Sequence, residues 1–271
     1  MKECMDDASS GHIRENKKGR KTVYLCRHLI AGRSQVVQCE IDRMKPDDYD
    51  EAVKLHNRAT KGLSCEIFVQ TPEKDMRRLL GRGGISLGVW FDGRLICMRA
   101  IVTDGKWVDE ILADMGFDAD PARKTVYTDH CVVDKDFRGN NIQFLTHYEM
   151  ENRIVDRYET FYTTVSPKNS FSLQNILGCN FVIVGLKELY SGNLRYILKK
   201  PLSRCIPIWT RGHLVIPIRD TKRQTTAIAE GYVGYKLIRR PRGFSVLYAP
   251  AGDNPPKGYW RNMAVSKQEE Y

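Results

Sequence analysis

The segment most capable of chemistry is Val132–Gln143, VVDKDFRGNNIQ, where a strand-like run passes through a short loop into a helical pattern. The loop is Arg138-Gly139-Asn140-Asn141. The first N–H groups of a helix have no partner within the helix and lie at its positive end, so such a joint can bind phosphate. Many joints of this kind bind nothing, so the segment by itself is a weak indication of a phosphate site.

Side chains able to transfer protons precede this loop, on the predicted strand Lys124–Val133. Regular alternation places Tyr127, Asp129 and Cys131 on one face of the strand, and Thr128, His130 and Val132 on the other. A carboxylate and an imidazole can both serve as general bases. Both also have structural interpretations, Asp129 as a hydrogen-bonded carboxylate at a strand end and His130 as a lone structural histidine.

The elements that must position these residues follow a mixed α/β order. Further strands are predicted at Val36–Met44, Ile85–Phe91, Arg94–Val102, Thr160–Val165, Phe181–Leu189 and Leu194–Leu198, and helices at Pro46–Ala59, Pro72–Leu80, Asn140–Tyr158 and Ser170–Leu177. Asp92-Gly93 lies between two apolar runs and predicts a hairpin. Thr71 is the predicted cap of the second helix. Lys106–Met115 fits a short helix or a loop, and Val23–Ile30 fits either a strand or a helix.

The chain from Pro201 predicts a small extension with its own strand, helix and hairpin, at His213–Ile218, Asp220–Glu230, Tyr232–Ile238 and Phe244–Tyr248. Its apolar runs alternate too little for solvated strands, and an isolated hairpin is marginal in water. We therefore expect residues 201–271 to pack on the core or on a second copy of the chain. Residues 1–34 form a basic N-terminal segment, expected to be partly disordered.

The net charge of +10 is concentrated at the two ends of the chain. Basic ends can attract phosphate, nucleic acid or an acidic partner, although such charge more often only keeps a protein soluble. No apolar run is long enough to span a membrane, and the N-terminus lacks the apolar stretch of a signal peptide, so we expect a cytoplasmic protein. The eight cysteines form no CxxC pair, and no metal site is predicted.

Two segments resemble the signatures of the GNAT acetyltransferase superfamily. The first, Val132–Gln143, is similar to its motif A, in which a strand ends in a pattern close to V-x-P-x-Y-R-G-x-G-x-G; the matching residues are Val133, Phe137, Arg138 and Gly139. The second, SPKNSFSLQNILGCNF, is similar to a later signature through Asn169, Ser172 and Phe181. The resemblance covers about residues 35–200. It implies a mixed, mostly antiparallel central sheet flanked by helices, followed here by the small C-terminal α+β extension.

The chain departs from these signatures at four positions. Lys135 replaces a proline, Asn180 replaces a glycine, and two loop glycines are Asn141 and Gln143. Asparagine tolerates left-handed backbone angles better than most residues, so Asn141 can keep the turn. Gln143 lies at the helix start, where its side chain could crowd a pyrophosphate.

The resemblance implies acetyl-CoA as co-substrate. The backbone of Cys131, Val132 and Val133 would pair with the pantetheine arm, as an added strand does. The pyrophosphate would be held by the backbone amides of Arg138, Gly139, Asn140, Asn141, Ile142, Gln143 and Phe144. Asn169 and Ser172 would contact the arm a second time.

The resemblance also suggests the reacting groups. Similar enzymes that carry a base on this strand have it near Tyr127 and Asp129, so Asp129 is the first candidate base and His130 the second. The tyrosine that often protonates the leaving thiolate corresponds to Ile176 here. Tyr162, on the neighbouring predicted strand, is the candidate replacement acid.

The implied reaction is transfer of an acetyl group to a primary amine by direct attack, with a small-molecule amine as acceptor and a homodimer as a possible assembly. Two alternatives stay open: acylation of a protein- or RNA-linked amine, and a catalytically reduced protein that binds coenzyme A or nucleic acid. No glycine–aromatic RNA-binding motif is present, which lowers the nucleic-acid alternative. The predicted acceptor loops, Ala59–Thr71 and Lys106–Lys124, carry no readable specificity code.

Overall fold

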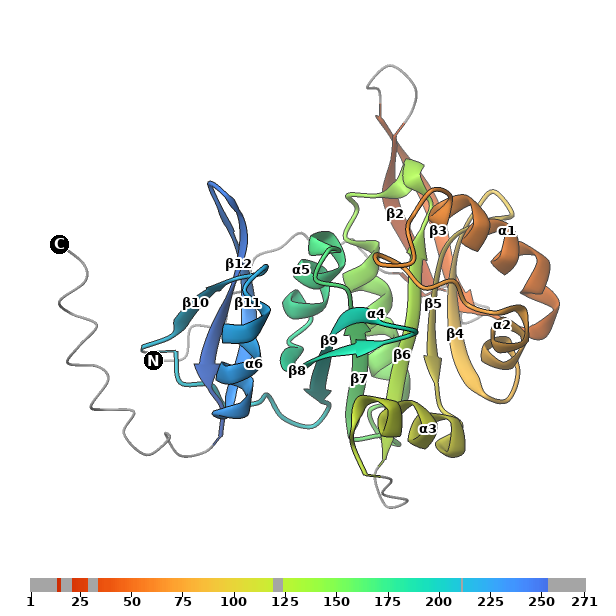
Figure 1. Ribbon diagram of the computed structural model, residues 1–271. Coiled ribbons are helices and arrows are strands. Elements are labelled where there is room, and N and C mark those ends of the chain that lie inside the picture. The colour runs from red at the N-terminus through yellow and green to blue at the C-terminus, as the bar shows by residue number, and fades with distance from the viewer. Residues whose placement is uncertain (1–13, 16–20, 29–33, 119–123, 211, 253–271) are drawn as a thin grey trace.

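The computed structural model describes residues 14–15, 21–28, 34–118, 124–210 and 212–252. The predicted disorder near the N-terminus falls mostly on positions outside these ranges. Twelve strands of the described chain form a single sheet in the order β1-β2-β3-β4-β5-β6-β7-β9-β8-β11-β12-β10 (Figure 1). All neighbouring pairs are antiparallel except β6 and β7. The predicted mixed, mostly antiparallel fold class is confirmed.

The core strands lie close to their predicted places. They are β3 (Ser34–Arg43), β4 (Gly84–Phe91), β5 (Arg94–Val102), β6 (Thr125–Val133), β7 (Thr160–Val165), β8 (Val182–Leu189) and β9 (Asn193–Pro201). The backbone of Asp92 and Gly93 is left-handed at both positions, with φ of 49° and 72°, which is what a two-residue hairpin turn matched to strand twist requires. Two strands precede this core, β1 (Arg14–Glu15) and β2 (Lys21–His28). The run Val23–Ile30, which fitted either a strand or a helix, is therefore a strand over its described residues.

Helices cover both faces of the sheet. α1 (Tyr49–Thr60), α2 (Glu73–Leu80) and α3 (Gly105–Met115) share one apolar cluster with β5 and β6. α4 (Ile142–Ile154) and α5 (Ser170–Gly178) pack on the opposite face in a second cluster. Thr71 does not cap α2, because the N-cap position is Pro72 and makes no side-chain cap bond. The side chain of Thr71 instead contacts a histidine of β6.

The C-terminal extension continues the core sheet. It consists of β10 (Leu214–Pro217), α6 (Thr221–Ala229), β11 (Tyr232–Arg240) and β12 (Gly243–Pro250), and lies beside β8 and α5 in Figure 1. β11 pairs with β8 where Gly234 faces Ile183. A Cβ at Gly234 would lie 2.8 Å from Cδ1 of Ile183, so the close approach of the two strands requires a residue without a side chain. Ile216 and Val246 complete the apolar cluster beneath α4 and α5.

One buried glutamine of α6 joins the extension to the core. Oε1 of Gln224 accepts hydrogen bonds from the hydroxyl of Tyr196 in β9, at 2.6 Å, and from that of Tyr248 in β12, at 2.8 Å. Its Nε2 donates to the carbonyl of Ile218 at 2.9 Å. Burial raises the pKa of both tyrosines, so their hydroxyls remain donors. All three side chains are buried, and their bonds therefore tie α6 and β12 of the extension to β9 of the core.

Replacing Gln224 with leucine should destabilise the whole chain. The two tyrosine hydroxyls would lose their acceptor while buried, which costs about 1–3 kcal/mol for each, so we expect the free energy of unfolding to fall by about 2–4 kcal/mol in urea titrations. The control is Thr225→Leu, at an exposed position of the same helix. Adding Tyr196→Phe to Gln224→Leu should restore part of the loss. Equal stability of Gln224→Leu and the control would refute this role.

Candidate active site

The candidate site lies where β6 and β7 separate. The two strands run parallel and pair at Thr125–Thr160, Val126–Phe161 and Tyr127–Tyr162, and the ladder stops there. One side-chain bond follows, from the hydroxyl of Thr163 to the carbonyl of Thr128 at 3.0 Å. Over its remaining length β6 is paired only with β5, whereas β7 is paired with β9 along its whole length. The second half of β6, which contains the predicted pantetheine-binding residues Cys131–Val133, therefore has an edge that an extended ligand could pair with.

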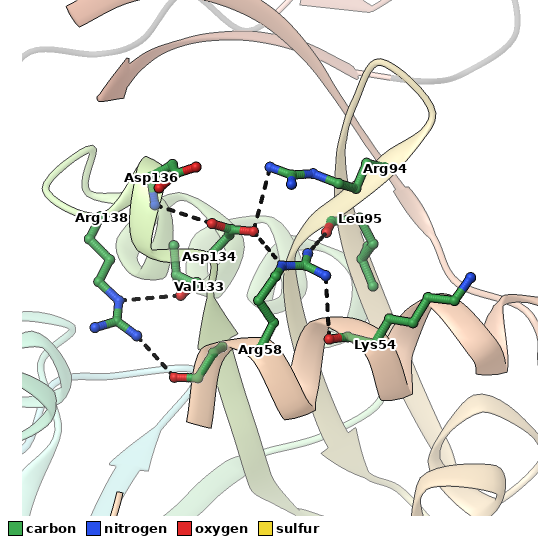
Figure 2. A network of polar contacts seen from close by, with 9 residues as sticks. Lys54, Arg58, Arg94, Leu95, Val133, Asp134, Asp136 and Arg138 are labelled. Atoms are coloured by element: carbon green, nitrogen blue, oxygen red, sulfur yellow. Dashed lines mark hydrogen bonds and ion pairs between the residues drawn. The ribbon is translucent and has the colours of Figure 1, made fainter. Parts of the chain in front are cut away.

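A buried carboxylate fixes the start of the loop that follows β6 (Figure 2). Oδ2 of Asp134 accepts a hydrogen bond from Nε of Arg58 in α1, at 2.8 Å, and lies 3.5 Å from Nη2 of Arg94 in β5. Its Oδ1 accepts from the N–H of Asp136 at 3.1 Å. Burial acts to raise the pKa of Asp134, but the bonds from Arg58 and Asp136 and the two guanidinium charges outweigh it and hold that pKa below its usual value.

Arg138 completes this network on the other side of the loop. Its Nε donates to the carbonyl of Val133 at 3.3 Å, and its Nη2 to the carbonyl of Ala59 at 3.0 Å, near the end of α1 (Figure 2). The loop start is thus tied to α1 by Asp134 and by Arg138. Its orientation relative to the sheet is set before any ligand arrives.

The loop itself has the backbone that a phosphate cradle needs. Gly139 and Asn141 are both left-handed, with φ of 81° and 54°, so Asn141 takes the conformation expected of it in place of a glycine. Arg138, Gly139 and Asn141 are exposed. α4 begins at Ile142 with no side chain capping its first turn, which leaves the first N–H groups of the helix without that partner.

The side chain of Gln143 does not crowd the loop. Its Oε1 accepts a hydrogen bond from Nδ2 of Asn175 in α5, which directs the amide toward the neighbouring helix. The backbone carbonyl of Gln143 accepts from Nη2 of Arg99 at 2.8 Å. Phe144 packs on α5 as well, where a Cβ at Gly178 would meet its ring at 2.6 Å. The residues present therefore fit a bound pyrophosphate.

The N-terminal strand β2 supports the same loop. The side chain of Asn140 accepts from the N–H of Cys26 and donates to its carbonyl, both at 2.6 Å. Further along α4, Lys21 forms an ion pair with the buried Glu149 at 2.6 Å. Asn140, predicted only as a phosphate-binding amide, is therefore also the residue that joins the loop to β2.

A buried arginine lies beneath the first turn of α4. Arg99 of β5 is 1% exposed, and its Nε donates to Thr146 at 3.1 Å. Its Nη1 is buried and has no hydrogen-bond partner among the described residues. A hydrogen bond to Cys97 and the charge of Arg99, against the effect of burial, lower the pKa of the Cys131 thiol to about 6. The site thus carries a fixed positive charge that the residue pattern had not revealed.

The predicted alternation of β6 is wrong beyond Thr128. Ala100 pairs with His130 and Ile101 with Thr128, so Asp129 is an extra residue in the strand, a β-bulge. Side chains after a bulge change faces. Val132 consequently shares an apolar cluster with Tyr127. Cys131 instead lies on the α4 side, where it packs against the cluster that contains Ile142 and where the charge of Arg99 acts on its pKa. His130, predicted opposite Tyr127, packs against α1.

The bulge brings Asp129 beside His130. Oδ2 of Asp129 lies 3.5 Å from Nδ1 of His130, and Oγ1 of Thr71 lies 3.1 Å from the same nitrogen. The ring of His130 is 5.4 Å from that of His56 in α1. Nε2 of His56 is 2.6 Å from Oε1 of Gln70. Burial, and then the nearby His130, lower the pKa of His56, which keeps it neutral near pH 7.

The two candidate tyrosines are buried. The hydroxyl of Tyr127 lies 3.0 Å from Oγ1 of Thr164 and 2.9 Å from the hydroxyl of Tyr190. Burial, with smaller contributions from Tyr190 and Asp129, raises its pKa well above the usual value, so this hydroxyl stays protonated and is a weaker acid than an exposed tyrosine. The ring of Tyr162 packs on Phe117 with centroids 5.1 Å apart.

The second signature lies at the start of α5. Oδ1 of Asn169 accepts from the N–H of Ser172 at 3.1 Å and caps the helix. Ile176 is buried in the apolar cluster under α4 and α5. Asn169 and Ser172 are therefore placed at a helix N-terminus next to the one that follows β6, and Asn175 joins the two helices through Gln143.

The α1–α2 loop covers one side of the strand separation. Arg195 of β9 donates to the carbonyls of Cys65 and Glu66 at 2.8 and 2.9 Å, and Glu66 forms an ion pair with Lys168 at 2.6 Å. The other predicted acceptor loop, Lys106–Lys124, includes positions outside the described residues. Gln70 and Thr71 reach the site through this loop and His56 through α1, and their spacing in the sequence gave no signal of it.

No group of histidine, cysteine and carboxylate side chains spaced to hold a metal ion occurs within the described ranges. No helix in the same part of the chain is long and apolar enough to cross a membrane.

The chain was compared with known proteins. No family model and no curated protein matches it. Solved structures do match it. One is a GNAT-family acetyltransferase from Streptococcus pneumoniae, which is 17% identical; the match covers 60% of this chain and 98% of that one, with a TM-score of 0.47. Another is the ribosomal-protein-S18-alanine N-acetyltransferase from Escherichia coli (12% identity, 62% and 96% coverage, TM-score 0.47). A third is a diaminobutyrate acetyltransferase from Paenibacillus lautus, solved with L-2,4-diaminobutyric acid and coenzyme A (15% identity, coverage of 63% of this chain and 99% of that one, TM-score 0.46).

Removing the charge of Asp134 should weaken the fold in a pH-dependent way. Asp134→Asn leaves Arg58 and Arg94 without their buried partner, so we expect a loss of about 2–4 kcal/mol of unfolding free energy near neutral pH. Because the folded-state pKa of Asp134 is lowered, its stabilisation is present above the unfolded pKa of an aspartate and is lost as the pH falls through the folded value.

Urea titrations from neutral to acidic pH measure this difference. The stability gap between wild type and Asp134→Asn should narrow toward acid. Asp136→Asn is the control, since it keeps the N–H that bonds to Asp134. A gap that is absent at neutral pH, or that does not change with pH, would show that the carboxylate does not organise the loop.

Proposed function

We propose that this chain is a GNAT-superfamily acyltransferase that transfers an acetyl group from acetyl-CoA to a primary amine by direct attack. The observation that carries the proposal is the strand–loop–helix joint Cys131–Phe144. It combines an open strand edge, an exposed loop with two left-handed residues and an uncapped helix start. This arrangement coincides with the segment whose residues resemble motif A.

Each part of the joint has a role in holding acetyl-CoA, which when bound supplies a thioester as acetyl donor. The backbone of Cys131–Val133 pairs with the extended arm. The amides from Arg138 to Phe144 bind the pyrophosphate, assisted by the helix dipole and by the buried charge of Arg99. Asn169 and Ser172, at the start of α5, border the arm on its other side.

The chemistry requires a proton acceptor for the amine and a proton donor for the thiolate. The pair of Asp129 and His130 at the bulge is the proton-accepting group of the proposal. Tyr127 is the first candidate donor of the two tyrosines, because Thr164 and Tyr190 hold its hydroxyl at the edge of the strand separation. Tyr162 remains the second candidate.

Coenzyme A binding tests the proposal directly. Asn141→Asp places a negative charge beside the pyrophosphate and should weaken the affinity roughly tenfold, since about 1–2 kcal/mol of repulsion is expected between such charges in water-exposed sites. Asn141→Gly keeps the left-handed backbone and is the matched control, with near wild-type affinity.

Isothermal titration of the three proteins with coenzyme A gives the affinities, and free-thiol release from acetyl-CoA with a panel of primary amines gives turnover. Equal affinity of wild type and Asn141→Asp, or the absence of coenzyme A binding by the wild type, would contradict the proposal.

A further inference from the structure

Two neighbouring histidines on the α1 side of β6 each have a buried ring nitrogen without a hydrogen-bond partner among the described residues. These nitrogens are Nδ1 of His56 and Nε2 of His130, and the two rings lie 5.4 Å apart. Oδ2 of Asp129, beside them, has no hydrogen bond within the same part of the chain but lies 3.5 Å from Nδ1 of His130. Buried polar atoms are nearly always satisfied, because leaving one unpaired costs about 1–3 kcal/mol. Two such nitrogens on adjacent rings therefore mark a place where a hydrogen-bonding ligand can bind.

The protonation of both rings follows from their neighbours. Nε2 of His56 faces Oε1 of Gln70 at 2.6 Å, and the same oxygen lies 3.3 Å from the hydroxyl of Thr60, so Nε2 carries the proton of the neutral ring. Nδ1 of His56 is therefore unprotonated and has a lone pair that can accept a hydrogen bond.

Nδ1 of His130 faces the carboxylate of Asp129 and the hydroxyl of Thr71. A carboxylate on one ring nitrogen stabilises the N–H there and leaves the other nitrogen as an acceptor. Nε2 of His130 is therefore also unprotonated and able to accept a hydrogen bond. The cluster then offers two imidazole lone pairs, beside a carboxylate whose Oδ2 faces Nδ1 of His130.

The complement of two lone pairs beside a carboxylate is a cation with several N–H donors. An anion would face both lone pairs and the carboxylate charge, and the described residues hold no metal-binding group. The ring of Phe68 adds an aromatic wall, with its centroid 5.6 Å from that of His56 and 6.5 Å from that of His130. An alkylammonium group fits such a site through its three N–H bonds and its contact with the ring.

We propose that His56, His130 and Asp129 form the subsite that binds the acceptor as an alkylammonium ion, and that Nε2 of His130 takes its first proton. This inference rests on the proposed function and deepens it. Asp129 acts as a positioning residue that stabilises the imidazolium through Nδ1. The freed amine nitrogen then attacks the thioester carbonyl; the C–N bond forms, the C–S bond breaks, and the second proton of the nitrogen leaves with the thiolate as a thiol.

The ring tautomers can be read without any turnover. Long-range proton–nitrogen NMR spectra of the full chain should show His56 as the Nε2–H form and His130 as the Nδ1–H form. His56 in the Nδ1–H form or His130 in the Nε2–H form would overturn the inference, whether or not coenzyme A binds. If the tautomers are as expected but the wild type neither binds coenzyme A nor turns over, the failure belongs to the proposed function.

Kinetics on the same amine panel test the roles. His130→Ala should lower kcat by about 100-fold or more, with coenzyme A affinity unchanged, and added imidazole should restore part of the rate. His56→Phe should raise the KM of the amine more than it lowers kcat, because it removes an acceptor of the ammonium.

His147→Gln is the matched control, since His147 is equally buried but lies in α4 against Lys200 and Glu151. It should lower stability without changing the KM of the amine. A His130→Ala enzyme with near-normal kcat, or one that imidazole does not rescue, would refute the assignment of the base.

Discussion

The structure depends on the short parallel pairing of β6 with β7. Every other neighbouring pair in the sheet is antiparallel, and this one ends after three residue pairs. Beyond Tyr127 and Tyr162 the two strands diverge, and each is then paired only with its other neighbour, β6 with β5 and β7 with β9. The helices that follow them, α4 and α5, start side by side. The divergence therefore brings an open strand edge and two neighbouring helix N-termini to the same place.

Much of this was predictable from the residues. The Asp-Gly turn, the strands on either side of it and the helix after Arg138-Gly139 all appear where their patterns indicate, because local backbone preference and long-range packing agree at these positions. Asn141 is left-handed, as its side-chain type permits. The extra residue at Asp129 was not predictable, since a bulge depends on the register between β5 and β6 and leaves no mark in the alternation of a single strand.

That one residue changes which chemistry the strand can perform. Regular alternation would place His130 on the α4 side, away from Tyr127. The bulge instead directs it toward α1, where it meets His56 and Thr71. Neither partner has any sequence relation to the strand: His56 comes from α1, and Thr71 comes from the α1–α2 loop, which Arg195 holds through Cys65 and Glu66. Sites of this kind emerge only when tertiary contacts between separate elements are known.

The described segments before and after the core, β1–β2 and β10–β12, extend the sheet rather than add separate bodies. β2 lies along the start of α4 and bonds to Asn140, and the extension bonds to β8 and closes over the cluster that also contains α4 and α5. Both additions therefore stabilise elements that carry the loop.

The central claim is that this loop and the open edge of β6 bind coenzyme A. The most direct measurement is a backbone-amide NMR titration of the full chain with coenzyme A. The account predicts the largest shifts at Gly139–Phe144 and at Cys131–Val133, with smaller ones at the start of α5. Shifts concentrated elsewhere, or none at saturating coenzyme A, would contradict it.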